Sequence, residues 1–330
     1  MRRYYTAIIL SIVALTFAWI GVFYFQLSAP TAKTSWVYEA YQIKVDSAKN
    51  KEGEPRLLFA SGSSTLYSVR TFDIEENLGI PAVNLAVHAG LDTRYMFDVV
   101  RRVAQDGDIV VLPLEYHMYT AEEDRWNDIT VDYLVSRDEA YFHDLSVLEK
   151  ARVVQKIGFG RMIQSIGNKF VSPKPEPTIS IGEDEFIGYH VLNSNGDEMN
   201  NVSSQRSIGM ISEQPPYEFF DTDDDRLQII RDFVSWSRQN NITVIGAYPP
   251  MIDFEEYQNS EYRSFFNDVS AFWESIGVAT MAAPLDFLYP PSLMYNSGYH
   301  LNDVGTTLHT QKLIELLRES DEMVKLLEVK

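Results

Sequence analysis

Alternation between short apolar runs and amphipathic stretches is the feature that most limits how this chain folds. The runs that predict strands are residues 56–60, 82–87, 108–114, 242–247 and 278–282. The stretches that predict helices are residues 71–78, 93–104, 222–239 and 255–276, with a last helix that Asn302 caps and that runs toward Leu317. Strands that alternate with helices are typical of a parallel sheet covered on both faces. We therefore expect an α/β fold, a doubly wound parallel sheet in a three-layer, flavodoxin-like arrangement.

The alternation stops for about 100 residues in the middle of the chain. We interpret residues 117–216 as an insertion with some loop character, containing a helix at 146–156 and a Pro-rich joint. Because the sheet pattern is complete without it, this insertion is expected to stand apart from the sheet, over its strand ends.

An uncharged apolar run at the N-terminus predicts where in the cell the protein lies. Residues 4–25 carry no charge, and Arg2 and Arg3 precede them. About 20 apolar residues in a helix span a bilayer core, and leading arginines favour a cytoplasmic N-terminus. We expect residues 1–32 to be an uncleaved anchor and residues 33–330 to lie outside the cytoplasmic membrane. A cleaved signal peptide and a buried helix of a soluble protein are the alternatives.

Charge excludes one large class of partners. The chain has 28 Lys and Arg against 47 Asp and Glu, a net charge of −19. Without Arg2, Arg3 and Lys33 the body is near −22, so nucleic acid, which requires a basic surface, is not an expected partner. The same charge predicts that the body stands off anionic headgroups. The chain has no cysteine, which excludes disulfides and thiolate chemistry.

Polar residues follow several of the predicted strands, where ligands bind in open α/β sheets. The four segments are Gly62-Ser63-Ser64, Asn84 to Gly90, Pro113 to Tyr116, and Tyr299 to Gly305. His117, His143, His190 and His309 show no metal-ligand spacing among themselves, so we expect no metal site.

On these segments the chain resembles the SGNH/GDSL hydrolase superfamily. It is most similar to the membrane-anchored proteins that handle acyl groups on cell-envelope polymers, in D-alanyl transfer to teichoic acids and in alginate O-acetylation. The resemblance covers residues 56–116 and 242–316. It implies that Ser64 is the nucleophile and that His300 is its base. It also implies that the N–H groups of Ser64 and Gly90 bind the oxyanion, with Ala89 as the alternative to Gly90.

Two positions depart from the pattern of the superfamily. Glu115 and Tyr116 stand where an Asn side chain normally donates to the oxyanion, and a carboxylate only accepts hydrogen bonds. Asn296 and Ser297 stand where an aspartate normally precedes the histidine. We expect Asn296 to orient His300 without supplying charge, and we assign Glu115, Tyr116 and His88 to substrate binding.

Two functions follow from the resemblance. The first is acyl-ester chemistry without a cofactor, an esterase when water is the acceptor and an O-acyltransferase when a sugar hydroxyl is. The second is a non-catalytic domain that binds or scaffolds envelope polysaccharide. Either implies an acylated carbohydrate as partner, together with the lipid bilayer and other membrane proteins of polymer synthesis.

Overall fold

A computed structural model describes residues 1–120, 125–171, 179–180, 186–187, 191–202 and 225–329. The chain divides into two compact units, with residues 1–38 and 124–177 in unit 1 and residues 39–123 and 178–330 in unit 2. The division falls within helix α2 (Ser35–Asn50).

Unit 2 contains a four-stranded parallel sheet in the order β2-β1-β3-β6, which confirms the expected α/β fold. Leu58 pairs with Val83 on one side and with Val110 on the other, and Val110 in turn pairs with Val244. The strands are almost wholly buried and apolar, as strands covered on both faces must be. The strands are β1 Leu57–Phe59, β2 Ala82–Asn84, β3 Ile109–Pro113 and β6 Thr243–Ala247.

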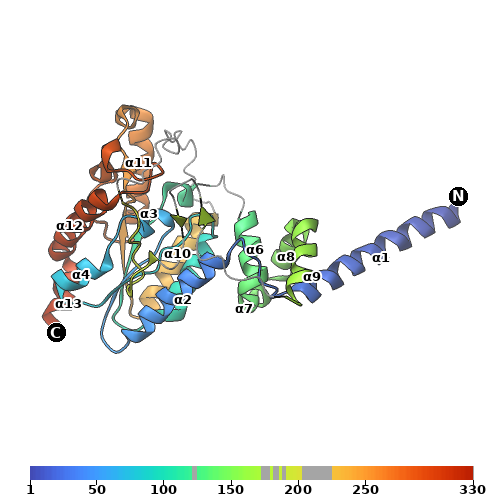
Figure 1. Ribbon diagram of the computed structural model, residues 1–330. Helices are drawn as coiled ribbons and strands as arrows, with labels where there is room; N and C mark the ends of the chain where they lie inside the picture. The colour runs from blue at the N-terminus through green and yellow to red at the C-terminus, as the bar shows by residue number, and fades with distance from the viewer. Residues whose placement is uncertain (121–124, 172–178, 181–185, 188–190, 203–224, 330) are drawn as a thin grey trace. The chain divides into compact units, whose positions relative to one another are not determined.

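Right-handed crossovers place the helices of unit 2 on both faces of this sheet. The crossover from β1 to β2 runs in the opposite direction to those from β2 to β3 and from β3 to β6, so α4 lies on one face and α5 and α10 on the other. Helix α12 packs on α4, and Figure 1 shows α4, α12 and α13 together. The helices are α3 Ser63–Leu66, α4 Thr71–Leu78, α5 Thr93–Val103, α10 Asp225–Gln239, α11 Ser260–Ser275, α12 Asp303–Glu319 and α13 Asp321–Val329.

The expected fifth strand, residues 278–282, is reduced to one bridge. Thr280 forms an isolated parallel bridge with Gly246, flanked by backbone hydrogen bonds from Gly246 to Ala279 and from Met281 to Gly246. Ala282 has φ +58°, a left-handed conformation that turns the chain away from β6 and ends the pairing.

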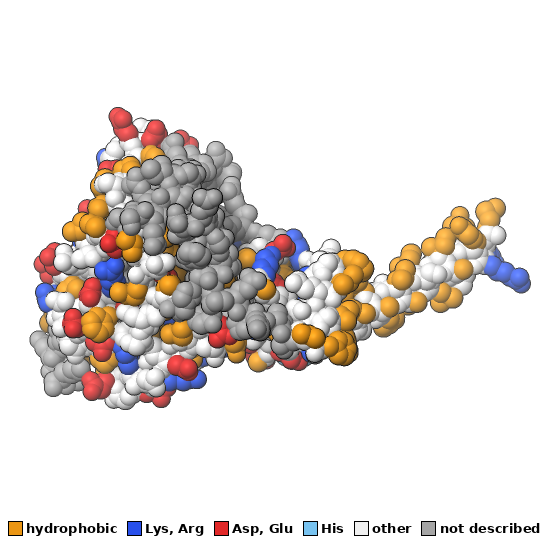
Figure 2. Space-filling model, in the orientation of Figure 1, with side chains coloured by type: hydrophobic (Ala, Val, Ile, Leu, Met, Phe, Trp, Pro, Cys, Tyr) orange, Lys and Arg blue, Asp and Glu red, His pale blue; other side chains and the backbone are white. Residues whose placement is uncertain are grey.

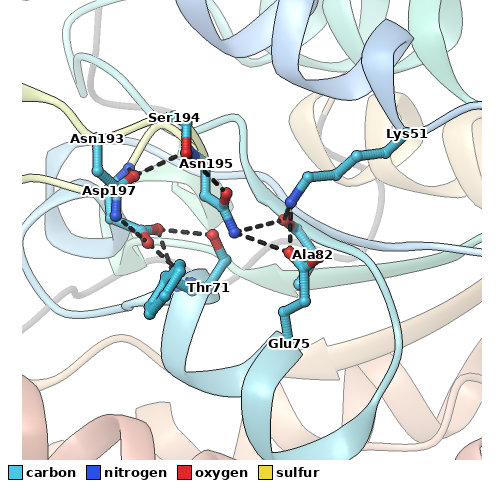
Figure 3. Close-up of polar contacts among 9 residues, drawn as sticks. Lys51, Thr71, Glu75, Ala82, Asn193, Ser194, Asn195 and Asp197 are labelled. Atoms are coloured by element: carbon cyan, nitrogen blue, oxygen red, sulfur yellow. Dashed lines mark hydrogen bonds and ion pairs between the residues drawn. The ribbon is translucent and has the colours of Figure 1, made fainter.

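A polar turn covers the edge strand β2 (Figure 3). The Asn84 N–H donates to the Asn195 carbonyl at 3.1 Å, and Asn195 Nδ2 donates to the Ala82 carbonyl at 3.3 Å. The Asp197 carboxylate accepts from the N–H groups of Thr71 and Phe72, at 2.8 and 2.9 Å, and so caps α4. The turn satisfies backbone groups that an open edge would offer to another chain.

Unit 1 is helical and joins two segments that are distant in sequence. Its helices are α1 Arg2–Gln26, α6 Asp128–Arg137, α7 Glu139–Asp144, α8 Val147–Lys156 and α9 Phe159–Asn168. Helix α1 is long and apolar enough to cross a membrane, and 6% of its most apolar window is buried. Only its last turns are enclosed, because Phe23 packs on Phe142 with ring centroids 5.4 Å apart.

A buried carboxylate holds the two segments of unit 1 together. Asp132 on α6 accepts hydrogen bonds from Thr31 and Thr34, at 2.5 and 2.7 Å, and from Arg161 Nε at 2.9 Å. Residues 124–177 of the expected insertion thus belong to unit 1 with the N-terminal segment, whereas the turn at 193–197 belongs to unit 2. The expected insertion also includes residues outside the described part of the chain, His190 among them.

Candidate active site

Ser63 is the serine that faces the histidine. It is the first residue of α3, after the turn that leaves β1. Its Oγ lies 2.9 Å from His300 Nε2, and the residue is partly exposed. A serine hydroxyl within hydrogen-bond reach of an imidazole is the arrangement that nucleophilic catalysis requires.

The expected pairing of Ser64 with His300 is not formed. Ser64 is fully buried, and its Oγ has no hydrogen-bond partner among the described residues. Consecutive side chains on a helix point about 100° apart, so only one of the two adjacent serines can face His300. The motif Gly62-Ser63-Ser64 contains both serines. The sequence of the motif does not show at which residue α3 begins, and so does not show which serine faces His300.

Asn296 orients His300, as expected. Its Oδ1 lies 2.7 Å from His300 Nδ1. Because an amide oxygen only accepts, Nδ1 carries the proton and Nε2 is free to accept from the Ser63 hydroxyl. The Ser297 hydroxyl accepts from the His300 N–H at 3.2 Å, and the Tyr67 ring stacks on the imidazole with centroids 4.4 Å apart.

The surroundings of His300 keep its ring neutral. Desolvation by burial, with a smaller electrostatic effect of His88, lowers the pKa of His300 to about 3. Asn296 adds no opposite charge that would raise it again. The imidazole is therefore always in the form that accepts a proton at neutral pH, although a low pKa makes it a weak base.

Both N–H groups assigned to the oxyanion are already engaged. The Ser64 N–H donates to Glu115 Oε1 at 2.8 Å, and the Gly90 N–H donates to His88 Nδ1 at 2.8 Å. The Ser63 N–H is the remaining candidate, since the first N–H of a helix has no partner inside that helix. Stabilisation of a developing oxyanion at Gly90 requires His88 to release that group.

The Glu115 side chain leaves room only for a glycine at position 62. A Cβ at Gly62 would lie 2.6 Å from Glu115 Oε1 and 2.7 Å from Ala89 Cα, so no larger residue fits there. Glu115 itself is 3% exposed. Its carboxylate supports the backbone of the turn that carries Ser63, which corrects the assignment to substrate binding.

Tyr116 is also a core residue. Its side chain is fully buried, and its ring packs on Phe265 and Phe266 with centroids 5.7 and 5.1 Å apart. A ring enclosed in this way has no face left for a sugar. His88 remains beside the site as the partner of Gly90, and burial lowers its pKa.

Two buried asparagines position the site, and the sequence reasoning missed their roles. Asn84 Nδ2 donates to the carbonyls of Thr65 and Val69, which fixes the segment that contains α3. Asn201 Nδ2 donates to the carbonyls of Tyr67 and Leu301, on the two segments that flank His300. Asn84 is a polar residue within the predicted strand 82–87, which could have indicated its role, whereas Asn201 lies in a polar segment where it does not stand out.

The described residues include no group of three His, Asp or Glu side chains placed to hold a metal ion.

Comparisons with known proteins add weak similarities. No family model matches the chain, and no curated protein is similar to it. An acetyl xylan esterase structure is 11% identical with a TM-score of 0.40, covering 79% of this chain and 98% of its own. The acetylxylan esterase Axe2 of Geobacillus stearothermophilus is 12% identical with a TM-score of 0.39, covering 81% and 95%. Similarities at this level do not assign a family, and the case for a function rests on the site.

Proposed function

We propose that this chain performs acyl-ester chemistry through Ser63, His300 and Asn296, as a serine enzyme of the SGNH type. The observation that carries the proposal is the continuous relay from Ser63 Oγ to His300 Nε2, at 2.9 Å, and from His300 Nδ1 to Asn296 Oδ1, at 2.7 Å. Ser63 follows β1, whereas His300 and Asn296 lie in one loop before α12. The meeting of these two segments, which are distant in sequence, favours a catalytic role.

The order of proton and bond changes follows from this geometry. Ser63 Oγ attacks the ester carbonyl while His300 Nε2 takes the hydroxyl proton. The tetrahedral intermediate collapses, the bond to the alcohol breaks, and the alcohol leaves with the proton from His300. The acyl group is then on Ser63 and passes to water or to a sugar hydroxyl, whose proton His300 accepts in turn. The first acceptor makes an esterase and the second an O-acyltransferase.

Oxyanion stabilisation limits the rate in this proposal. The Ser63 N–H is one donor, and the Gly90 N–H becomes a second only after it leaves His88 Nδ1. Loss of one such donor typically costs about 10²–10³ in rate. Together with an asparagine in place of an aspartate, this predicts slow turnover on simple soluble esters.

We place this activity on cell-envelope polysaccharide, outside the cytoplasmic membrane. Helix α1 supports anchoring, since it begins with two arginines, is otherwise apolar and is exposed along most of its length. An anchored enzyme acts most readily on a polymer made or exported at the same membrane. Other membrane proteins of polymer synthesis are the expected partners.

A non-catalytic polysaccharide-binding role is the second candidate. The engaged N–H groups of Ser64 and Gly90 favour it, because they leave fewer donors for a transition state. In that case the Ser63–His300 contact would serve only to hold two loops together.

Labelling of the full chain in detergent with a fluorophosphonate distinguishes the two functions. The reagent reacts with a serine only when a base activates it. We expect an adduct that mass spectrometry locates on Ser63, and we expect His300→Ala to abolish it. An unlabelled wild-type protein, or equal labelling of His300→Ala, would exclude the catalytic role.

A further inference from the structure

An apolar stripe on α9 is exposed at its surface. Phe159, Ile163 and Phe170 are 68%, 54% and 77% exposed, and their spacing of four and seven residues puts them on one side of the helix and its following turn. The buried residues of α9, Met162 and Ser165, lie on an adjacent side of the helix. A cluster of large exposed apolar side chains at helical spacing marks a binding surface.

This α9 stripe lies beside the last turns of α1. The Phe159 ring stacks near Trp19 and the Phe170 ring near Phe25, each with centroids 6.4 Å apart. Trp19 Nε1 also donates to the Val154 carbonyl, at the end of α8, at 3.3 Å. Both ends of the stripe are therefore tied to the segment of α1 between Trp19 and Phe25.

The position of these contacts along α1 indicates that lipid covers the stripe. Phe25 ends the apolar run of α1, and Trp19 lies six residues earlier, about 9 Å along the helix axis. If α1 spans a bilayer with Phe25 at the interface, Phe159 lies at the depth of Trp19. The stripe then runs obliquely, from the interface at Phe170 to about 9 Å below it at Phe159. This is within the depth of about 5–10 Å to which interfacial helices bury their apolar face.

The charge around the stripe suits a headgroup layer. Residues 146–171, which contain α8 and α9, have one acidic residue, Glu149, against five basic ones, Lys150, Arg152, Lys156, Arg161 and Lys169. Figure 2 shows apolar side chains along α1 and on the adjoining part of its unit. Basic residues that flank an apolar face are typical of helices at anionic membrane surfaces.

We infer that α9 is an interfacial helix whose stripe of Phe159, Ile163 and Phe170 lies in the outer leaflet, next to α1. Unit 1 is then a membrane-embedded base rather than a flexible stalk. This inference differs from the expectation that the whole body stands off the headgroups. The inference rests on the membrane span of the proposed function.

The chain has no cysteine, so single labels can be placed in the full protein without other changes. We would label Ile163→Cys and Phe170→Cys with an environment-sensitive fluorophore and reconstitute each in vesicles with one-quarter anionic lipid. Val13→Cys, in the middle of α1, reports the span itself, and Leu308→Cys, on an exposed position of α12, is the control in water. Each label is exposed to nitroxide lipids and, separately, to aqueous iodide.

We expect lipid-borne nitroxide to quench positions 13, 163 and 170 at least about threefold more than position 308, and iodide to do the reverse. If lipid-borne nitroxide quenched only position 13, α9 would not be an interfacial helix. The stripe would then be covered by a protein partner. Equal iodide quenching at all four positions would overturn the membrane span as well. Val171→Cys, at a 74% exposed neighbour, replaces either label whose variant does not fold.

Discussion

The two units of this chain differ in charge and in what their buried polar groups do. Unit 1 has 11 Lys and Arg against eight Asp and Glu, a net charge of +3, and unit 2 has 17 against 39, a net charge of −22. Unit 1 uses its central carboxylate, Asp132, to join distant segments. Unit 2 uses buried amides to hold Ser63 and His300 in reach of each other. Unit 1 thus joins its distant segments through a charged group, whereas unit 2 fixes its segments through neutral amides.

The largest expected effect is on ester turnover in unit 2. It tests whether turnover depends on Ser63 and not on the adjacent Ser64. Ser63→Ala should lower ester turnover by at least about 10³-fold, because the nucleophile is lost. Ser64→Ala, one residue away, should retain most of the turnover, since its hydroxyl is buried and does not contact His300. Initial rates on an aryl acetate would measure both. Full activity in Ser63→Ala would show that the site is elsewhere.

The next effect is confined to unit 1. Asp132→Ala leaves Arg161, Thr31 and Thr34 without their shared acceptor, and breaking a buried pair in this way costs about 3–5 kcal/mol. Asp128→Ala is the matched control on the same helix, because its side chain is 89% exposed and its ion pair with Lys33 is worth about 0–1 kcal/mol. Denaturant unfolding in micelles would give both values.

Asp132→Ala also tests whether the two units are energetically independent. Fluorophosphonate labelling of Ser63 should be unchanged in Asp132→Ala, since none of the four groups of this cluster belongs to unit 2. A parallel loss of labelling would show that the two units are coupled.

A smaller effect concerns the relay in unit 2. Asn296→Asp places a carboxylate 2.7 Å from His300 Nδ1, which stabilises the imidazolium that forms during reaction. We expect turnover to rise about tenfold to hundredfold, part of the 10⁴-fold by which aspartate exceeds asparagine in serine proteases. Asn296→Ala should lower it. A fall in both variants would mean that the asparagine contributes packing and not orientation.

The smallest effect is in the pH profile. Because burial lowers the pKa of His300 to about 3, its neutral form persists well below the usual value of 6.5. We expect kcat/KM to change by less than about twofold between pH 8 and pH 5. A half-loss near pH 6.5 would show an ordinary, solvated histidine.

The stability of the fold should depend on pH in the same range. His300 and His309 both have a lowered pKa of about 3 in the folded chain, and the unfolded chain takes up their protons near pH 6.5. The free energy of unfolding therefore falls as pH falls from about 6.5 toward 3, in the direction that proton linkage requires.

The sequence predicted unit 2 far better than unit 1. Strand–helix alternation is a local signal, so α4 (Thr71–Leu78) begins and ends at the expected residues and the Asn302 cap holds α12 through Gly305. Unit 1 depends on contacts such as Thr31 with Asp132, across 101 residues, and no local pattern indicates those.

Within the site, the histidine and its asparagine were predictable and the serine was not. His300 and Asn296 are four residues apart in one loop, and the resemblance implies a residue there that orients the histidine. The choice between Ser63 and Ser64 depends on where α3 starts after β1, a rotation of about 100° that residue type does not encode.

The discontinuity of unit 1 also sets an order of events during synthesis. Helix α1 and residues up to 38 emerge first, and their packing partners begin only at residue 124, after β1, β2 and β3 have been made. At about 5–20 residues per second, this delay of some 85 residues lasts about 4–17 s. Phe23 and Gln26, both 0% exposed in the finished unit, spend that time without the helices that enclose them. The end of α1 therefore becomes a packed element only after the first three strands of the sheet have been made.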